Sequence, residues 1–172
     1  AKAAEPLLER GVTTVGAGRR DGIFRGRSLV ASLGTGPAAE EVLSARGPQW
    51  LSFDKGSSEQ QYPSSQMGSI ALLRQTFLDA RWYAEARASL GRNPALPALE
   101  TNRSLEALIG LTEGFLFEVD DEQSLLRAAR IAAEAGLRFD FVGSHLEYLE
   151  ADAISALGRT IVLPLALPGT PA

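Results

Sequence analysis

The chain has 172 residues, a net charge of −4 and 45% hydrophobic residues, which is the composition of a globular protein with one domain and one core. This mild acidity argues against a nucleic-acid-binding surface, and no apolar run approaches the roughly 20 residues of a membrane helix. We therefore expect neither nucleic acid nor a membrane as a partner. The absence of cysteine excludes disulfides and thiolate zinc sites and fits either the cytoplasm or the periplasm. Because Met67 is the only methionine, we expect the chain to come from a longer polypeptide.

The N-terminal part predicts short elements around a glycine-rich loop. A helix is expected to end over residues 5–10, closed by Gly11, and the VTTV run at 12–15 predicts a strand. This order is typical of an α/β repeat, so the chain is expected to begin within one. The loop from Gly16 to Gly26 is not a dinucleotide-binding motif, since its third glycine is out of register.

Three arginines lie close together in this loop. Asp21 interrupts the sequence of Arg19, Arg20 and Arg25. Basic clusters that bind nucleic acid are longer. The pattern therefore favours a solvated loop over an anion site.

Two strands and a short helix are predicted between residues 28 and 53. The SLVASL run at 28–33 predicts a strand that is open to pairing in a hairpin, and residues 38–43 predict a short helix. Residues 50–53 predict a third strand.

The longest predicted element is a helix that follows a polar loop at residues 56–66. Either Ser64 or Ser65 is a suitable N-cap. Apolar residues at spacings of three and four then form one stripe, namely Ile70, Leu73, Phe77, Ala80 and Ala84. The helix is expected to end near Gly91. Trp82 and Tyr83 are predicted to serve packing or an interface.

Helices and strands alternate from residue 103 onward. Helices are predicted over 104–111, 122–135 and 150–157, and strands over 115–119, 138–142 and 160–165. This is the pattern of parallel βα repeats. The right-handed crossover rule then places successive strands side by side in one parallel sheet.

Several runs of sequence are similar to one known family. PSSQMGSIALLRQTFLDARWY, at residues 63–83, resembles a segment of the imidazolonepropionase-like branch of the amidohydrolase superfamily. The upstream runs GVTTVGAG, DGIFRGRSLVASL and SFDKGSS and the downstream run GFLFEVDDEQSLLRAARIAAEAGLRFDFVG resemble other parts of that branch. The resemblance extends from about Leu7 to about Pro168.

The resemblance implies a metal-dependent hydrolase on a (β/α)₈ TIM barrel, acting on carbon–nitrogen bonds of amides, cyclic amides or dipeptides. In such an enzyme a metal ion activates a water molecule, and the active residues lie at the C-terminal ends of the strands. Because a barrel needs about 250 residues, we expect residues 1–172 to form a single α/β domain. This domain would be a partial barrel, a mostly parallel sheet flanked by helices.

Most metal-binding positions implied by the resemblance are changed in this sequence. The chain has one histidine, so the opening His-x-His pair is absent. The next family histidine falls on Glu118, and the following one falls on Val142, three residues before His145. An aspartate of the last strand would lie beyond Ala172. We therefore expect no cofactor in this chain and no hydrolysis by it alone, with zinc or another divalent metal in the parent protein.

Two residues are candidates for catalysis. Glu118 ends an apolar strand, where partial desolvation suits a general base or a metal ligand. The alternative is an exposed or paired glutamate at a strand end. His145 lies at a strand-to-helix turn after Gly143, and its alternative is a surface or capping histidine.

A second set of candidates predicts substrate binding. Asp54 and Lys55 follow the 50–53 strand, and a polar pocket is expected beside the N-terminus of the long helix, where free N–H groups favour a carboxylate. The pocket-lining candidates are Ser57, Ser58, Tyr62, Ser64 and Ser65. The alternatives are an ion pair between Asp54 and Lys55 and an ordinary flexible loop.

Two other interpretations remain open. The chain is either part of a hydrolase or a non-catalytic structural or ligand-binding domain that supports a separate catalytic half. A free-standing module of flavodoxin type would explain the repeats without the resemblance, and it would show a reversal of strand order. The expected partners are the rest of the parent polypeptide, a small-molecule substrate and, because a partial barrel has exposed sheet edges, a second copy of the chain.

Overall fold

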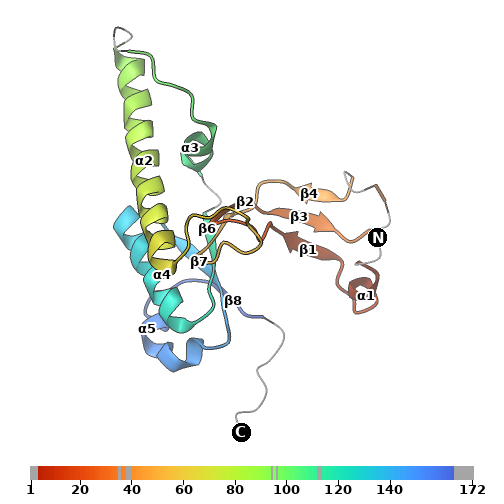
Figure 1. The fold of residues 1–172 in the computed structure, drawn as a ribbon. Coiled ribbons are helices and arrows are strands. Elements are labelled where there is room, and N and C mark those ends of the chain that lie inside the picture. The colour runs from red at the N-terminus through yellow and green to blue at the C-terminus, as the bar shows by residue number, and fades with distance from the viewer. Residues whose placement is uncertain are drawn as a thin grey trace.

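The computed structural model describes residues 4–34, 36–37, 40–93, 95, 97–111 and 114–164. Its strands form two sheets (Figure 1). A five-stranded sheet with the order β2-β5-β6-β7-β8 lies against the main helices, and a three-stranded sheet with the order β1-β3-β4 stands beside it.

The larger sheet is mostly parallel and open. Its strands are β2 (Phe24–Arg27), β5 (Gln49–Ser52), β6 (Phe115–Glu118), β7 (Phe139–Val142) and β8 (Ile161–Val162). β2 pairs antiparallel with β5, and the other neighbours pair in parallel. The parallel strands follow chain order, as predicted, and show no reversal of the doubly wound kind. Within the described residues β2 and β8 each pair on one side only, so the sheet does not close.

Helices connect the parallel strands. The 27-residue helix α2 (Gln66–Arg92) and the short α3 (Arg103–Leu108) lie between β5 and β6, and α4 (Glu122–Ala135) lies between β6 and β7. A 3₁₀ turn, η1 (Glu147–Glu150), leads into α5 (Ala151–Ser155) before β8. None of the described helices has the length and apolar character needed to cross a membrane.

Capping residues explain where the main helices begin and end. The Ser65 hydroxyl accepts the Gly68 N–H at 3.2 Å, which starts α2. The Asp121 carboxylate accepts the Ser124 N–H at 2.5 Å and starts α4. Gly136, with φ of +68°, ends α4 in the left-handed conformation that suits glycine.

The core lies between the sheet and the helices, because alternate strand residues point to the same face. Phe115, Phe117, Phe139 and Phe141 are buried, whereas the residues between them are more exposed. Phe77 of α2 meets Phe115 edge to face with 5.5 Å between ring centroids. The alternation places Glu118 on the sheet face opposite the helical core.

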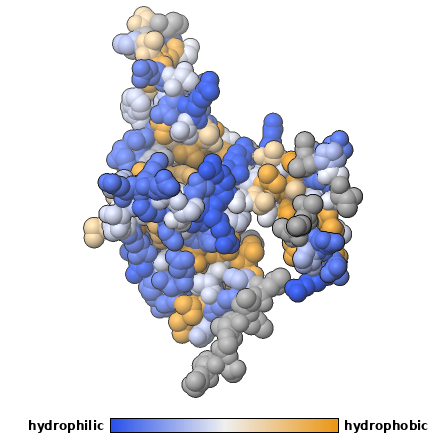
Figure 2. Space-filling model, turned by 45° about the vertical axis from the view of Figure 1, so that its right-hand side comes forward, coloured by the Kyte–Doolittle hydropathy of each residue, from blue (hydrophilic) through white to orange (hydrophobic). Residues whose placement is uncertain are grey.

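The small sheet corrects the prediction for the N-terminus. After α1 (Glu5–Leu8), strand β1 (Thr14–Ala17) pairs antiparallel with β3 (Leu29–Ser32), which pairs antiparallel with β4 (Val42–Ser44). The hairpin interpretation of residues 28–33 is therefore confirmed, whereas the expected start within an α/β repeat is wrong. No residue of these three strands is buried. Figure 2 shows hydrophobic surface on this part of the molecule.

The prediction of a short helix over residues 38–43 is wrong at its C-terminal end. Val42 and Leu43 belong to β4, and Val42 pairs with Ala31. The ladder to β3 therefore overrides the local preference for a helix. Residues 38 and 39 lie outside the described part of the chain.

The prediction also missed β2, which lies within the glycine-rich loop. The register with β5 shifts between Phe24 and Gly26, and Gly26 has a φ of +85°. A bulge of this kind interrupts the alternation by which a strand is found in sequence. The helix predicted over 104–111 is α3, Arg103–Leu108, and Asn102 caps its start.

The two last predicted elements are shorter in the structure. The helix expected over 150–157 is α5, Ala151–Ser155, and it follows η1. The strand expected over 160–165 is the two-residue β8, and residue 165 lies outside the described residues.

Candidate functional site

Polar groups gather at the C-terminal ends of β5 and β6. The two strands run in parallel with Ser52 opposite Glu118. Asp54 and Lys55 therefore follow β5 at the same edge at which Asp120 follows β6. In βα-repeat proteins this edge is the one that carries functional residues.

Arg25 reaches this edge from the antiparallel strand β2. Its side chain is only 4% exposed, and Nη1 donates to the Glu118 carboxylate. Nη2 donates to the Asp54 carbonyl at 3.0 Å, and Nε donates to the Gly22 carbonyl at 3.1 Å. One buried cation thus connects β2, the end of β5 and the end of β6.

The environment of Arg25 overturns the prediction of a solvated loop for this residue. Arg19 and Arg20 are exposed, as expected. Arg25 instead lies in β2, whose pairing with β5 carries the guanidinium against the sheet. Arg20 is 3.9 Å from the second oxygen of Glu118, so arginines contact both oxygens of this carboxylate.

Asp120 follows β6 at this edge, and its pKa is raised above the ordinary value. Partial desolvation raises its pKa, and the neighbouring charges of Asp54, Glu118 and Asp121 raise it further, while Arg25 opposes them. Sequence reasoning did not include Asp120 among the candidates. The EVDD run, which places three carboxylates within four residues, was the available signal.

The structure brings most of the predicted substrate-binding residues to two neighbouring cavities. A cavity of about 320 Å³ is lined by Asp54, Lys55, Ser64 and Ser65, among others. A second cavity of about 290 Å³ is lined by Lys55, Ser58 and Tyr62, among others. Lys55 lines both, and its ammonium donates to the Gln60 carbonyl at 2.5 Å. Ser57 lines neither cavity.

The N-termini of two helices lie beside the first cavity. Ser69, in the first turn of α2, donates from its hydroxyl to the Phe53 carbonyl at 2.7 Å. Gln66 donates from its side-chain amide to the Ser124 hydroxyl at 3.1 Å, which joins α2 to α4. Both helices therefore begin at the polar edge, where their free N–H groups favour negative charge.

His145 lies on the loop after β7. Its φ of +75° is uncommon for a residue other than glycine. Its Nε2 atom is buried and has no hydrogen-bond partner in the described part of the protein. Among the hydrogen bonds and ion pairs of the described residues, none joins His145 to Glu118.

The residues at this edge do not fit a metal centre. No group of three or more histidine, aspartate or glutamate side chains among the described residues is arranged to bind a metal ion. The chain has one histidine and no cysteine, and both oxygens of Glu118 face arginines.

These features define a βα-repeat protein with a polar site at the C-terminal edge of its parallel strands. The structure is similar to the crystal structure of an amidohydrolase from Thermotoga maritima MSB8, with a TM-score of 0.81 over 95% of this chain and 18% sequence identity. This likeness shows a shared fold. The chain spans 45% of the length of that protein. No family model matches the sequence, and no curated protein matches it.

Proposed function

We propose that this chain is an amidohydrolase-type domain, and that its parent protein hydrolyses carbon–nitrogen bonds of amides, cyclic amides or dipeptides. The observation that carries the proposal is the fold, which follows an amidohydrolase over 95% of the chain. The sequence runs around residues 63–83 support the finer placement in the imidazolonepropionase-like branch. The open parallel sheet would be part of a TIM barrel in the parent.

The polar edge would bind the substrate. Lys55 and the N-terminus of α2 lie at one cavity, and together they suit a small molecule with a carboxylate. Ser64 and Ser65 would contact the same group, while Ser58 and Tyr62 would contact the rest of the substrate in the neighbouring cavity. Ser57 lines neither cavity and would act from the exposed turn after Lys55.

Glu118 is the proposed catalytic carboxylate, and His145 is the second candidate. Arg25 fixes the position of Glu118 at the end of β6. Because the described residues do not fit a metal centre, the ligands for zinc or another divalent ion would come from the rest of the parent polypeptide. The isolated chain would then be inactive.

The test is an assay of the isolated chain with added zinc against a cyclic amide and a dipeptide. We expect no turnover above that of a buffer blank. Clear turnover that purifies with the chain would refute its proposed inactivity.

A non-catalytic role is the second candidate. It is favoured by the commitment of Glu118 to Arg25 and Arg20, since a paired carboxylate at a strand end is a structural feature. The sequence of the full gene would distinguish the two candidate functions. A His-x-His pair upstream and an aspartate downstream would favour the hydrolase, whereas their absence would favour a scaffold that supports a separate catalytic half.

A further inference from the structure

A groove runs along α2 between α4 and α3, away from the polar edge. It consists of two cavities, of about 150 Å³ and about 250 Å³. The larger one is lined by Phe115 at the start of β6 and by Leu137 just before β7. The groove therefore extends toward the N-terminal ends of the strands, at the opposite end of the sheet from Glu118.

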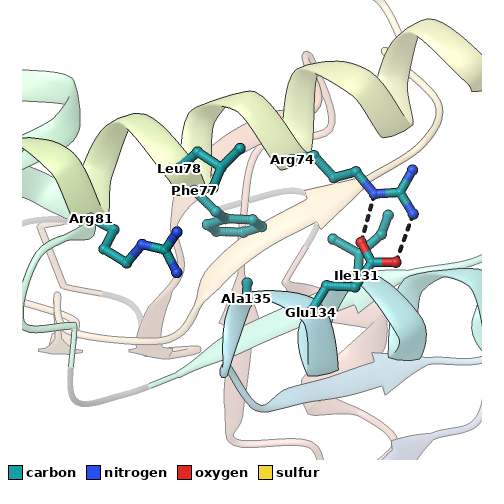
Figure 3. A pocket seen from close by; sticks show the side chains of 7 residues that line it. All are labelled: Arg74, Phe77, Leu78, Arg81, Ile131, Glu134 and Ala135. Carbon is teal, nitrogen blue, oxygen red and sulfur yellow. Dashed lines mark hydrogen bonds and ion pairs between the residues drawn. The ribbon is translucent and has the colours of Figure 1, made fainter.

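Apolar side chains make up most of the groove. Leu78 and Ile131 line the smaller cavity, and Ala84 and Leu108 line the larger. Phe77 lines both. Figure 3 shows the Phe77 ring between the guanidinium of Arg81 and the ion pair at the other end of the smaller cavity.

Arg81 occupies the point where the two cavities meet, since it lines both. Among the described residues it has no hydrogen-bond or ion-pair partner. Arg74 lines the smaller cavity too, but it has a partner. Its guanidinium donates two hydrogen bonds to the Glu134 carboxylate, at 2.6 and 2.8 Å. The groove thus has one satisfied arginine and one arginine that is free to pair.

The rim of the groove is basic in a chain whose net charge is −4. Glu134 is the acid of the smaller cavity, and the hydrogen bond and charge of Arg74 hold its pKa below the usual range. Arg130 adds a further positive charge near Glu134. With Glu134 paired to Arg74, the charges of Arg81 and Arg130 remain to attract an acidic group.

Exposed apolar residues extend this surface beyond the groove. Leu78 is 51% exposed and Trp82, four residues later on α2, is 60% exposed. Residues at this spacing are neighbours on a helix surface. Contiguous exposed apolar surface with a polar rim is typical of a site that binds another protein.

We propose that the groove of α2, α3 and α4 binds an acidic amphipathic segment of a partner protein. The segment places one apolar side chain in each cavity and a carboxylate between them on Arg81. The concave shape favours a peptide segment over a flat lipid surface, and the position of Arg81 between the cavities sets the order apolar, acidic, apolar. This interaction is independent of the proposed hydrolase function.

The test uses a helical peptide of about 14 residues with leucines at helix spacings of three and four and glutamates elsewhere. It is titrated into the whole isotope-labelled chain and followed by NMR, alongside a peptide with lysine in place of glutamate. We expect the acidic peptide to shift the amides of residues 74–84 and 131–137. Arg81→Glu is expected to weaken binding about fivefold or more. Arg92→Glu, an exposed change at the end of the same helix, is expected to leave binding unchanged.

Leu78→Ser provides a second variant that leaves the core intact, and we expect it to weaken binding as well. Equal binding of the lysine peptide, no binding of either peptide, or full binding by the Arg81→Glu variant would overturn the proposal. So would a preference for vesicles of phosphatidylcholine and phosphatidylglycerol over the acidic peptide. Concentration-dependent shifts of the same amides without peptide would assign the groove to a second copy of the chain and would also overturn it.

Discussion

The guanidinium of Arg25 donates to the carboxylate of Glu118 across a separation of 93 residues in the sequence. Arg25 also donates to the carbonyl of Asp54. The antiparallel strand β2 is thereby connected to the ends of two parallel strands. A buried charge is costly unless it is paired, so this pair holds the polar edge in one arrangement.

Replacement of Arg25 by methionine is expected to destabilise the fold. The change leaves the largely buried Glu118 carboxylate without its main partner, which we expect to lower the free energy of unfolding by about 2–3 kcal/mol. The melting temperature should fall by about 4–12 °C for a chain of this size. Thermal unfolding followed by circular dichroism measures this change.

Two further variants serve as controls for that experiment. Arg19→Met breaks the exposed ion pair with Asp21 and is expected to lower the melting temperature much less than Arg25→Met, because solvent screens this pair. Glu118→Gln combined with Arg25→Met should cost less than the sum of the single changes, because the two groups interact. A stability of Arg25→Met equal to that of Arg19→Met would contradict a structural role for the buried pair.

Replacement of Asp120 by asparagine is expected to stabilise the protein at neutral pH. The raised pKa of Asp120 means that the folded state holds this proton more tightly than the unfolded state. Protonated Asp120 therefore stabilises the folded state at pH values below the pKa of the unfolded chain, which is near 3.8. This stabilisation is lost as the pH rises through the higher pKa of the folded protein. The charged form thus opposes folding at pH 7.

The gain is expected to be small, below about 1 kcal/mol, because solvent screens an exposed carboxylate. Melting temperatures from pH 3 to pH 8 should show the advantage of Asp120→Asn at neutral pH and its disappearance in acid. Glu59→Gln, in the exposed polar loop, is the matched control. A lower melting temperature for Asp120→Asn at pH 7 would contradict the direction of this pKa shift.

Replacement of Ser69 by alanine is expected to loosen the start of α2. Ser69 is only 2% exposed, and its hydroxyl donates to the Phe53 carbonyl at 2.7 Å. Loss of this bond leaves a buried carbonyl unsatisfied at a cost of about 1–2 kcal/mol. Urea unfolding measures the change, with Ser64→Ala at an exposed position as the control. Equal stability of the two variants would show that Ser69 does not fasten α2 to β5.

Self-association is expected from the open sheet. Within the described residues, β2 and β8 pair on one side only, and unpaired sheet edges are prone to pairing with another chain. Size-exclusion chromatography with light scattering should show a mass above that of one chain as concentration rises. A monomer mass at every concentration would count against this prediction.

Local signals in the sequence account for the elements that were predicted correctly. Helix α4 has the predicted bounds because Asp121 caps its start and Gly136 closes its end. The parallel order of β6, β7 and β8 followed from the alternation of helices and strands. Strand β4 was missed because Val42 is held by its pairing with β3, which no local pattern in residues 38–43 indicates.

The candidate site was predictable only in part. Asp54 and Lys55 lie with Ser64 and Ser65 at one cavity, because a strand end and the start of the next helix are close in sequence. The role of Arg25 was missed because its partner Glu118 is remote in the chain and its strand contains a bulge at Gly26. Pairing over such distances depends on tertiary structure, which sequence periodicity does not report.

The most direct test of the proposed function compares the full protein encoded by the gene with the isolated 172-residue chain. Both would be assayed with zinc against the same cyclic amide and dipeptide. We predict hydrolysis by the full protein, a reduced rate when Lys55 in it is replaced by methionine, and no hydrolysis by the isolated chain. Absence of hydrolysis by the full protein, or equal rates for the two, would contradict the proposal.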